Sequence, residues 1–125
     1  MLIFKEFSFE AAHRLPNVPA DHKCARLHGH SFHVRVQVRG AIGASSGWVM
    51  DFADIKRAVS PVHDALDHRY LNDVAGLENP TSEVLACWIW RALRGALPGL
   101  AEIEVRETCT SGCVYRGEDE DPRPL

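Results

Sequence analysis

Alternating apolar and polar residues predict two strands in the first third of the chain. Residues from Leu2 to about His13 are rich in Phe and Ile, a composition that favours a strand. From Ser31 to Arg39 the two kinds of side chain alternate strictly, as they do in a strand with one buried face. Pro16 to Arg26 holds two prolines and has no period, so we expect a loop between the strands.

A helical period follows a turn region. Gly40 to Gly47 contains three glycines and two serines, which predicts turns that lead into a short extended piece, Trp48 to Met50. Asp51 then offers an N-cap oxygen, and apolar residues recur three and four positions apart as far as Leu66, the stripe of an amphipathic helix. Pro61 lies inside this pattern, and we expect it to kink or divide the helix.

The second half of the chain predicts another helix and two more strands. Asn79 is the expected cap of this helix and Pro80 its first residue, and a Pro-Gly pair ends it. Ala101 to Glu107 and Gly112 to Arg116 favour strands. Two helices between two pairs of strands predict an α+β fold, with a four-stranded antiparallel sheet and both helices packed on one face. The open edges of such a sheet could be covered in a homo-oligomer that continues it between subunits.

The composition is that of an ordinary single domain. The chain has 125 residues, 46% of them apolar and 25% charged, and no apolar run approaches the ~18 residues that a membrane span needs. Its first residues do not resemble a signal peptide, so we expect a cytoplasmic protein whose four cysteines are reduced. The net charge of -3 gives no reason to expect nucleic acid as a partner.

The negative charge belongs to the C-terminus. Residues 1–116 carry equal numbers of acidic and basic side chains, whereas positions 118–121 are all acidic. We therefore expect one domain over residues 1–118 and a disordered acidic tail over residues 119–125. The first fifty residues hold six basic and three acidic side chains, which form either ordinary solvated surface or a site for an anionic small molecule.

The histidines contain a candidate metal site. His28 and His30 are two residues apart, so in a strand they project to the same face and could bind one ion. His33 has the opposite parity and is excluded as a ligand, whereas His13, at the end of the first strand, is the best third candidate. Three histidines leave zinc an open fourth position, as in catalytic sites. With seven histidines in the chain, chance or ordinary hydrogen bonding remains the alternative.

A cysteine and an Asp-His pair are candidates for proton transfer. Cys24 lies four residues before His28, and it could be a fourth ligand, a nucleophile, an acid–base thiol or an inert buried cysteine. Asp67 and His68 follow the first helix. They are either a solvated helix end or a relay in which the carboxylate orients an imidazole that activates a thiol.

Glu107 stands out because it shares a strand face with apolar Ile103 and Val105. A carboxylate on an apolar face must be paired or functional, because an unpaired buried charge is costly. A planar heterocycle rich in N–H groups could satisfy it with two parallel hydrogen bonds. Cys109 and Cys113, by contrast, have a spacing that fits neither metal nor redox motifs well, and we interpret them as structural thiols.

Five blocks of sequence, in order, carry a family resemblance. They are F-S-F-E-A-A-H-R-L (Phe7 to Leu15), C-A-R-L-H-G-H (Cys24 to His30), L-D-H-R-Y-L-N (Leu66 to Asn72), E-N-P-T-S-E (Glu78 to Glu83) and E-T-C-T-S-G-C-V-Y-R-G-E (Glu107 to Glu118). Together they resemble the 6-pyruvoyltetrahydropterin synthase family of the tunnelling fold, from about Leu2 to Glu118. The three-residue gap between Cys24 and His28 resembles its bacterial branch, which forms 6-carboxy-5,6,7,8-tetrahydropterin.

The resemblance implies a role for each candidate residue. It implies zinc as the metal, with His13, His28 and His30 as its ligands. It also implies that Cys24 is the catalytic thiol, that Asp67 and His68 form the relay for that thiol, and that the Glu107 carboxylate anchors the pterin ring. It also implies a homo-oligomer, often two trimers, with active sites between subunits.

The implied reaction converts 7,8-dihydroneopterin triphosphate to 6-carboxytetrahydropterin, acetaldehyde and triphosphate, an early step toward queuosine and other 7-deazapurines. Local charge suggests that Lys23, Arg26 or other bases of the N-terminal part meet the triphosphate. The alternatives are 6-pyruvoyltetrahydropterin synthase activity with the same site, or a non-catalytic module that binds a metal or a ligand.

Overall fold

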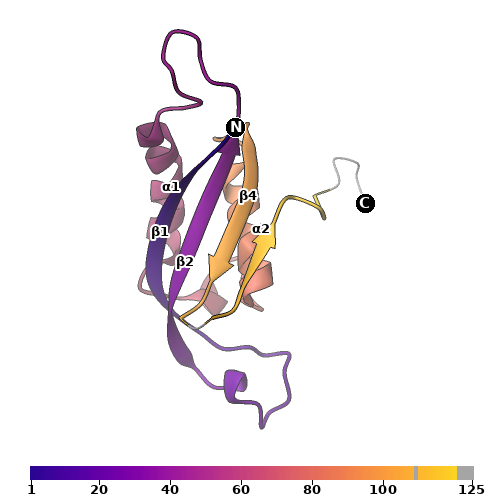
Figure 1. Cartoon of the computed structure of the whole chain (residues 1–125). Helices are drawn as coiled ribbons and strands as arrows, with labels where there is room; N and C mark the ends of the chain where they lie inside the picture. The colour runs from indigo at the N-terminus through magenta and orange to yellow at the C-terminus, as the bar shows by residue number, and fades with distance from the viewer. Residues whose placement is uncertain (109, 121–125) are drawn as a thin grey trace.

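The computed structural model describes residues 1–108 and 110–120, which form a sheet of five strands and two α-helices. The strands run in the order β3-β1-β2-β4-β5 across the sheet. Their bounds are β1 Leu2–His13, β2 His28–Arg39, β3 Arg69–Tyr70, β4 Leu100–Arg106 and β5 Gly112–Tyr115. Figure 1 shows both helices behind the sheet, whose front is open, with the loop between β1 and β2 extending beyond one end.

The prediction of four antiparallel strands was wrong, because the sheet has a fifth strand that runs parallel to its neighbour. In β3, Arg69 pairs with Ala11 and Tyr70 pairs with Ala12 of β1. Two residues are too few for any apolar period to show in the sequence. The other neighbouring strands, β1–β2, β2–β4 and β4–β5, are antiparallel. The fold is therefore α+β, with one short parallel pair at an edge.

Helix α1, Phe52–Leu66, continues through Pro61, so of the two expected outcomes, a kink or a division, the division does not occur. Its cap is the predicted one, since the Asp51 side chain accepts the Ala53 N–H at 2.9 Å. Proline removes one helical hydrogen bond, to the carbonyl of Arg57. Pro61 and Arg57 are both exposed, so water can solvate that carbonyl. The preceding residues 48–50 form bends rather than the predicted extended piece.

Helix α2, Ser82–Leu93, begins later than predicted. Its cap is Thr81, whose hydroxyl accepts the Val84 N–H at 3.1 Å, so the placement of Asn79 as cap and Pro80 as first residue was wrong. Thr81 has a hydroxyl and extended backbone, the usual features of a cap. Short 3₁₀ helices, η1 and η2, occupy Lys23–Ala25 and Leu71–Asp73.

The two faces of the sheet differ sharply. Phe9, Phe32, Val36 and Ile103 are buried on the face that meets the helices, and the register aligns Phe9 with Phe32 and Val36 with Ile103. Side chains two apart on a strand share a face, so the apolar stripes of adjacent strands form one core. The open face carries charge. Its ion pairs join Arg35 and Arg106 to Glu6 and Glu104.

The chain after β5 turns back onto α2. The carboxylate of Glu120 lies 2.7 Å from Arg91 Nε and 3.2 Å from a terminal nitrogen of Arg94. Glu120 and Asp119 are the described part of the predicted tail; the rest lies outside the described residues. Across residues 1–108 and 110–120, neither helix has the length and apolar character needed to cross a membrane.

Candidate metal centre

Three histidines meet at one end of the sheet, on the face that the helices cover. His13 ends β1 and His28 begins β2, and the two are cross-strand partners. His30 lies two residues further along β2, opposite Ala11. Their ligating atoms all lie within 4.8 Å of one another, and the ring centroids are 4.6–5.0 Å apart. The structure thus brings together the predicted ligand set, and His33 is exposed, outside the cluster.

Backbone carbonyls orient two of these rings. Nδ1 of His13 lies 2.8 Å from the Pro80 carbonyl oxygen, and Nδ1 of His28 lies 2.7 Å from that of Arg26. A carbonyl oxygen can only accept, so each Nδ1 carries a proton, and in the neutral tautomer each Nε2 has a free lone pair. Metal-binding histidines are commonly oriented in this way.

Within the described residues, no hydrogen-bond donor reaches the Nε2 lone pair of His13. His13 is 1% exposed, and its buried Nε2 has no hydrogen-bond partner. A buried polar atom without a partner costs free energy, and a cation coordinated by all three rings would remove that cost. Burial also lowers the pKa of His13, which favours the neutral form that binds metals. The residues present therefore fit a metal ion.

Glu107 lies beside this cluster, at the end of β4. Its Oε2 is 3.6 Å from His30 Nε2, and its Oε1 accepts the Ser82 hydroxyl at 2.7 Å. A hollow of about 320 Å³ adjoins the carboxylate, lined also by Ser82, Glu83 and Cys113. Because Glu107 is partly exposed to this hollow, one carboxylate can face both the histidines and a ligand.

The cysteines have different settings. Cys113 is partly buried at the hollow, where burial raises the pKa of its thiol to about 11, so it stays protonated near neutral pH; Cys109 lies outside the described residues. Cys24 lies in η1, in the loop that projects beyond the sheet, and its backbone N–H donates to His22 Nδ1 at 3.0 Å. Lys23 precedes it in the same turn.

Asp67 and His68 form a pair anchored to β1. Asp67 Oδ2 lies 2.9 Å from His68 Nδ1, and Asp67 Oδ1 accepts the Glu10 backbone N–H at 3.0 Å. That backbone bond first, and the His68 bond second, hold the pKa of Asp67 below its usual value. The backbone N–H of His68 donates to the Glu10 carbonyl at 2.6 Å. It has a φ of 57°, a left-handed conformation that is uncommon outside glycine and often found at functional sites.

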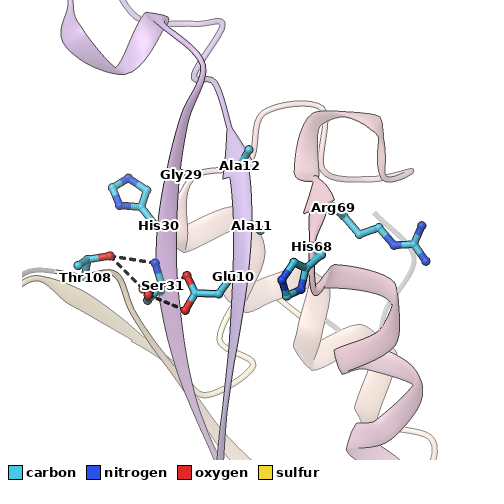
Figure 2. A pocket seen from close by; sticks show the side chains of 9 residues that line it. All are labelled: Glu10, Ala11, Ala12, Gly29, His30, Ser31, His68, Arg69 and Thr108. Carbon is cyan, nitrogen blue, oxygen red and sulfur yellow. Dashed lines mark hydrogen bonds between the residues drawn. The ribbon is translucent and has the colours of Figure 1, made fainter.

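The relay pair does not meet the thiol within one chain. Among residues 1–108 and 110–120, no hydrogen bond joins the Cys24 thiol to Asp67 or His68, and the His68 side chain is 79% exposed. In Figure 2, His30 lies beside β2 whereas His68 lies on the far side of β1. The structure therefore brings the three histidines together with Glu107, whereas Cys24 and His68 share no hydrogen bond within the described residues.

A second hollow, of about 520 Å³, lies between His30 and His68 and reveals residues that the sequence did not single out. Glu10, Ser31 and Thr108 line it and are joined by hydrogen bonds, as Figure 2 shows. The alternation of polar and apolar residues already predicts a polar, exposed side chain at each of these positions. Nothing in their spacing distinguishes them from ordinary surface, although all three fall inside the blocks that carry the family resemblance or directly beside them.

Comparison with known proteins identifies relatives of this chain. The family described as 6-pyruvoyl tetrahydropterin synthase matches residues 2–118. The chain is 52% identical to the 6-carboxy-5,6,7,8-tetrahydropterin synthase of Synechocystis, over 91% of this chain and 92% of that protein. It is 42% identical to the dihydroneopterin monophosphate aldolase of Pyrococcus furiosus, over 74% of each. The 6-pyruvoyl tetrahydropterin synthase of Caenorhabditis elegans has a similar structure, with a TM-score of 0.87 at 30% identity, over 94% of this chain and 96% of that one.

Proposed function

The chain belongs to the 6-pyruvoyl tetrahydropterin synthase family, and from that premise we propose that it is a zinc-dependent lyase acting on a pterin. Its substrates are 7,8-dihydroneopterin triphosphate and one water molecule, and its products are 6-carboxy-5,6,7,8-tetrahydropterin, acetaldehyde and triphosphate. One observation carries this proposal. A buried, oriented cluster of three histidines lies beside a partly exposed carboxylate in a chain 52% identical to a synthase named for that product.

Zinc is the ion that best suits the three histidines. Its ligands are typically imidazole nitrogens at about 2.0–2.1 Å, and a set of three leaves a coordination position open for substrate. His13, His28 and His30 would hold the ion, and the Pro80 and Arg26 carbonyls would keep two of the rings oriented. Bound there, zinc would supply Lewis-acid polarisation of the substrate's side-chain oxygens.

The other candidate residues bind the ring and move protons. Glu107 accepts two parallel N–H bonds from the pterin, which fixes the ring beside the metal-binding histidines. Cys24 takes and returns protons between the side chain and the ring, and His68 removes the proton of that thiol. Asp67 keeps the His68 ring oriented through the 2.9 Å contact with Nδ1. Lys23 and Arg26 flank Cys24 in sequence and meet the triphosphate.

The active protein is a homo-oligomer, with two trimers as the expected assembly and sites between subunits. Two observations support this. His68 is exposed and has no hydrogen bond to Cys24 within the described residues, and a neighbour's Cys24 would complete the relay. In addition, β3 pairs only with Ala11 and Ala12 of β1, so in the described residues most of the outer edge of β1 is available to another subunit's strand.

Product identification tests the reaction. The purified protein is incubated with 7,8-dihydroneopterin triphosphate, and the products are identified by mass spectrometry. Release of 6-carboxytetrahydropterin and acetaldehyde supports the proposal. A pyruvoyl product without acetaldehyde would assign the chain to the activity named in its Caenorhabditis elegans relative instead. Affinity for the pterin without release of triphosphate would show a non-catalytic binding module.

The setting of the enzyme is part of the proposal. We place the reaction in the cytoplasm, as an early step toward queuosine and other 7-deazapurines. Cys24, Cys87 and Cys113 are free thiols in the described residues, as expected in a reducing compartment. Failure of the product to serve as substrate for an enzyme that continues toward a 7-deazapurine would contradict this placement.

A further inference from the structure

The hydroxyl of Thr108 takes the place of a backbone partner at the end of the sheet. The last residues paired between β2 and β4 at this end are His33 and Arg106. Beyond them, Thr108 Oγ1 accepts the Ser31 N–H at 2.9 Å and donates to the Ser31 carbonyl at 3.3 Å. Figure 2 shows both bonds. One hydroxyl therefore satisfies the two backbone groups of Ser31 that another residue of β4 would otherwise pair.

Ser31 is itself held firmly. Its hydroxyl lies 2.7 and 2.8 Å from the two carboxylate oxygens of Glu10, which is its cross-strand partner on β1. The backbone of Glu10 is in turn bonded to Asp67 and His68. Thr108 is thus attached to a part of the sheet that two strands and the end of α1 hold in place.

Glu107 and Thr108 are consecutive residues just beyond the end of β4, and they make different contacts. The Glu107 carboxylate lies 3.6 Å from His30, whereas the Thr108 hydroxyl bonds to the backbone of Ser31 and lines the hollow between His30 and His68. A single peptide unit separates the two residues, so fixing one restricts the backbone of the other. His30 directly precedes Ser31 on β2. The bonds between Thr108 and Ser31 therefore fix the distance between Glu107 and the metal-binding strand.

We propose that Thr108 is a positioning residue for Glu107, which orients the carboxylate for the two N–H groups of the pterin ring. This inference rests on the proposed function, in which Glu107 anchors that ring. Two parallel hydrogen bonds to a carboxylate require a defined angle as well as a defined distance. The Ser82 hydroxyl fixes one carboxylate oxygen from α2, and Thr108 fixes the backbone from β2.

A pair of variants separates the hydroxyl from the shape of the side chain. Thr108→Val keeps the branched shape and removes both bonds to Ser31, whereas Thr108→Ser keeps the hydroxyl. We expect the valine variant to raise KM for 7,8-dihydroneopterin triphosphate about tenfold, since each lost bond is worth a factor of a few, with kcat and zinc content changed less. The serine variant keeps KM within about twofold of the wild-type value.

A double-variant cycle asks whether the effect passes through Glu107. The dissociation constant of 7,8-dihydroneopterin is measured by equilibrium dialysis for the wild type, Thr108→Val, Glu107→Gln and the double variant. We expect Thr108→Val to add nothing once the carboxylate is gone. Independent, multiplying effects would overturn the inference, as would an unchanged KM in the valine variant or an equal loss in the serine variant. If the wild-type protein itself does not turn over the substrate, the proposed function fails instead.

Discussion

The three candidate metal ligands and the proposed proton-transfer residues are held in place by different means. His13, His28 and His30 stand on two fully paired strands, with two of the rings oriented by backbone carbonyls. Cys24 lies in a three-residue 3₁₀ helix within a loop, and His68 has a side chain that is 79% exposed. A metal site needs several ligands placed before the ion binds. One chain therefore brings all three candidate metal ligands together, whereas the proposed relay needs Cys24 and His68 to meet between subunits.

Removing one strand-held ligand has the largest expected effect. His28→Ala leaves two histidines, so we expect loss of most bound zinc by elemental analysis and a fall in turnover of at least about a hundredfold. His33→Ala is the matched control, because this histidine lies on the same strand and is exposed outside the cluster. Full zinc occupancy in His28→Ala, or equal zinc loss in both variants, would contradict the ligand set.

Removing the Cys24 thiol tests whether proton transfer can be lost without loss of the metal. Cys24→Ala is expected to lower turnover by about 10²–10⁴-fold, the usual contribution of a general acid or base, while zinc content stays at the wild-type level. Cys87→Ala serves as control, since Cys87 is a partly buried thiol of α2 that packs against the core. Wild-type turnover in Cys24→Ala would rule out a catalytic role for this thiol.

We expect the free energy of unfolding to depend on packing around the strand-held histidines much more than on side chains of the loop that contains η1. Phe32 is fully buried, and its ring centroid lies 5.4 Å from that of His13 and 5.7 Å from that of His30. Phe32→Ala should lower the free energy of unfolding by about 3–5 kcal/mol, measured by urea denaturation. Leu27→Ala removes a 65% exposed side chain near η1 and should change it by less than about 0.5 kcal/mol. Equal losses would contradict this contrast.

The smallest expected effect concerns the pH dependence of Asp67. Its pKa in the folded protein lies below the ordinary value of 3.8, so its contribution to stability is present above that pH and is lost as pH falls through the folded pKa. Asp67→Asn removes this contribution. The difference in unfolding free energy between the two proteins should therefore shrink as pH is lowered from 7 to below 3.8. A difference that is constant with pH would show that the carboxylate charge plays no part.

Local patterns predicted most of the fold. The alternation in residues 31–39 and the helical stripe ending at Leu66 correspond to β2 and α1. The errors have physical reasons. The two residues of β3 pair with β1 because α1 delivers the chain beside it, and no local pattern encodes that. At α2, the side chains of Asn79 and Thr81 are both of a type that can cap a helix, and the helix begins after Thr81.

The candidate site, like the fold, contains residues that the sequence predicted and residues that it could not predict. Strand parity alone placed His28 and His30 on one face and His33 on the other, and pairing with β1 then brought in His13. The role of Thr108 could not be predicted, because it depends on where β4 stops pairing with β2. An exposed threonine near the end of a strand looks the same whether or not it bonds to a neighbour.

Subunit mixing tests the central claim, that the metal centre is complete in one chain and the relay is completed by another. Cys24→Ala and His68→Ala are each expected to be inactive as pure oligomers. When the two are co-expressed, some sites combine an intact Cys24 from one subunit with an intact His68 from the next. Random assembly should restore about a quarter of the wild-type turnover per site. A mixture as inactive as either variant alone would contradict the shared site.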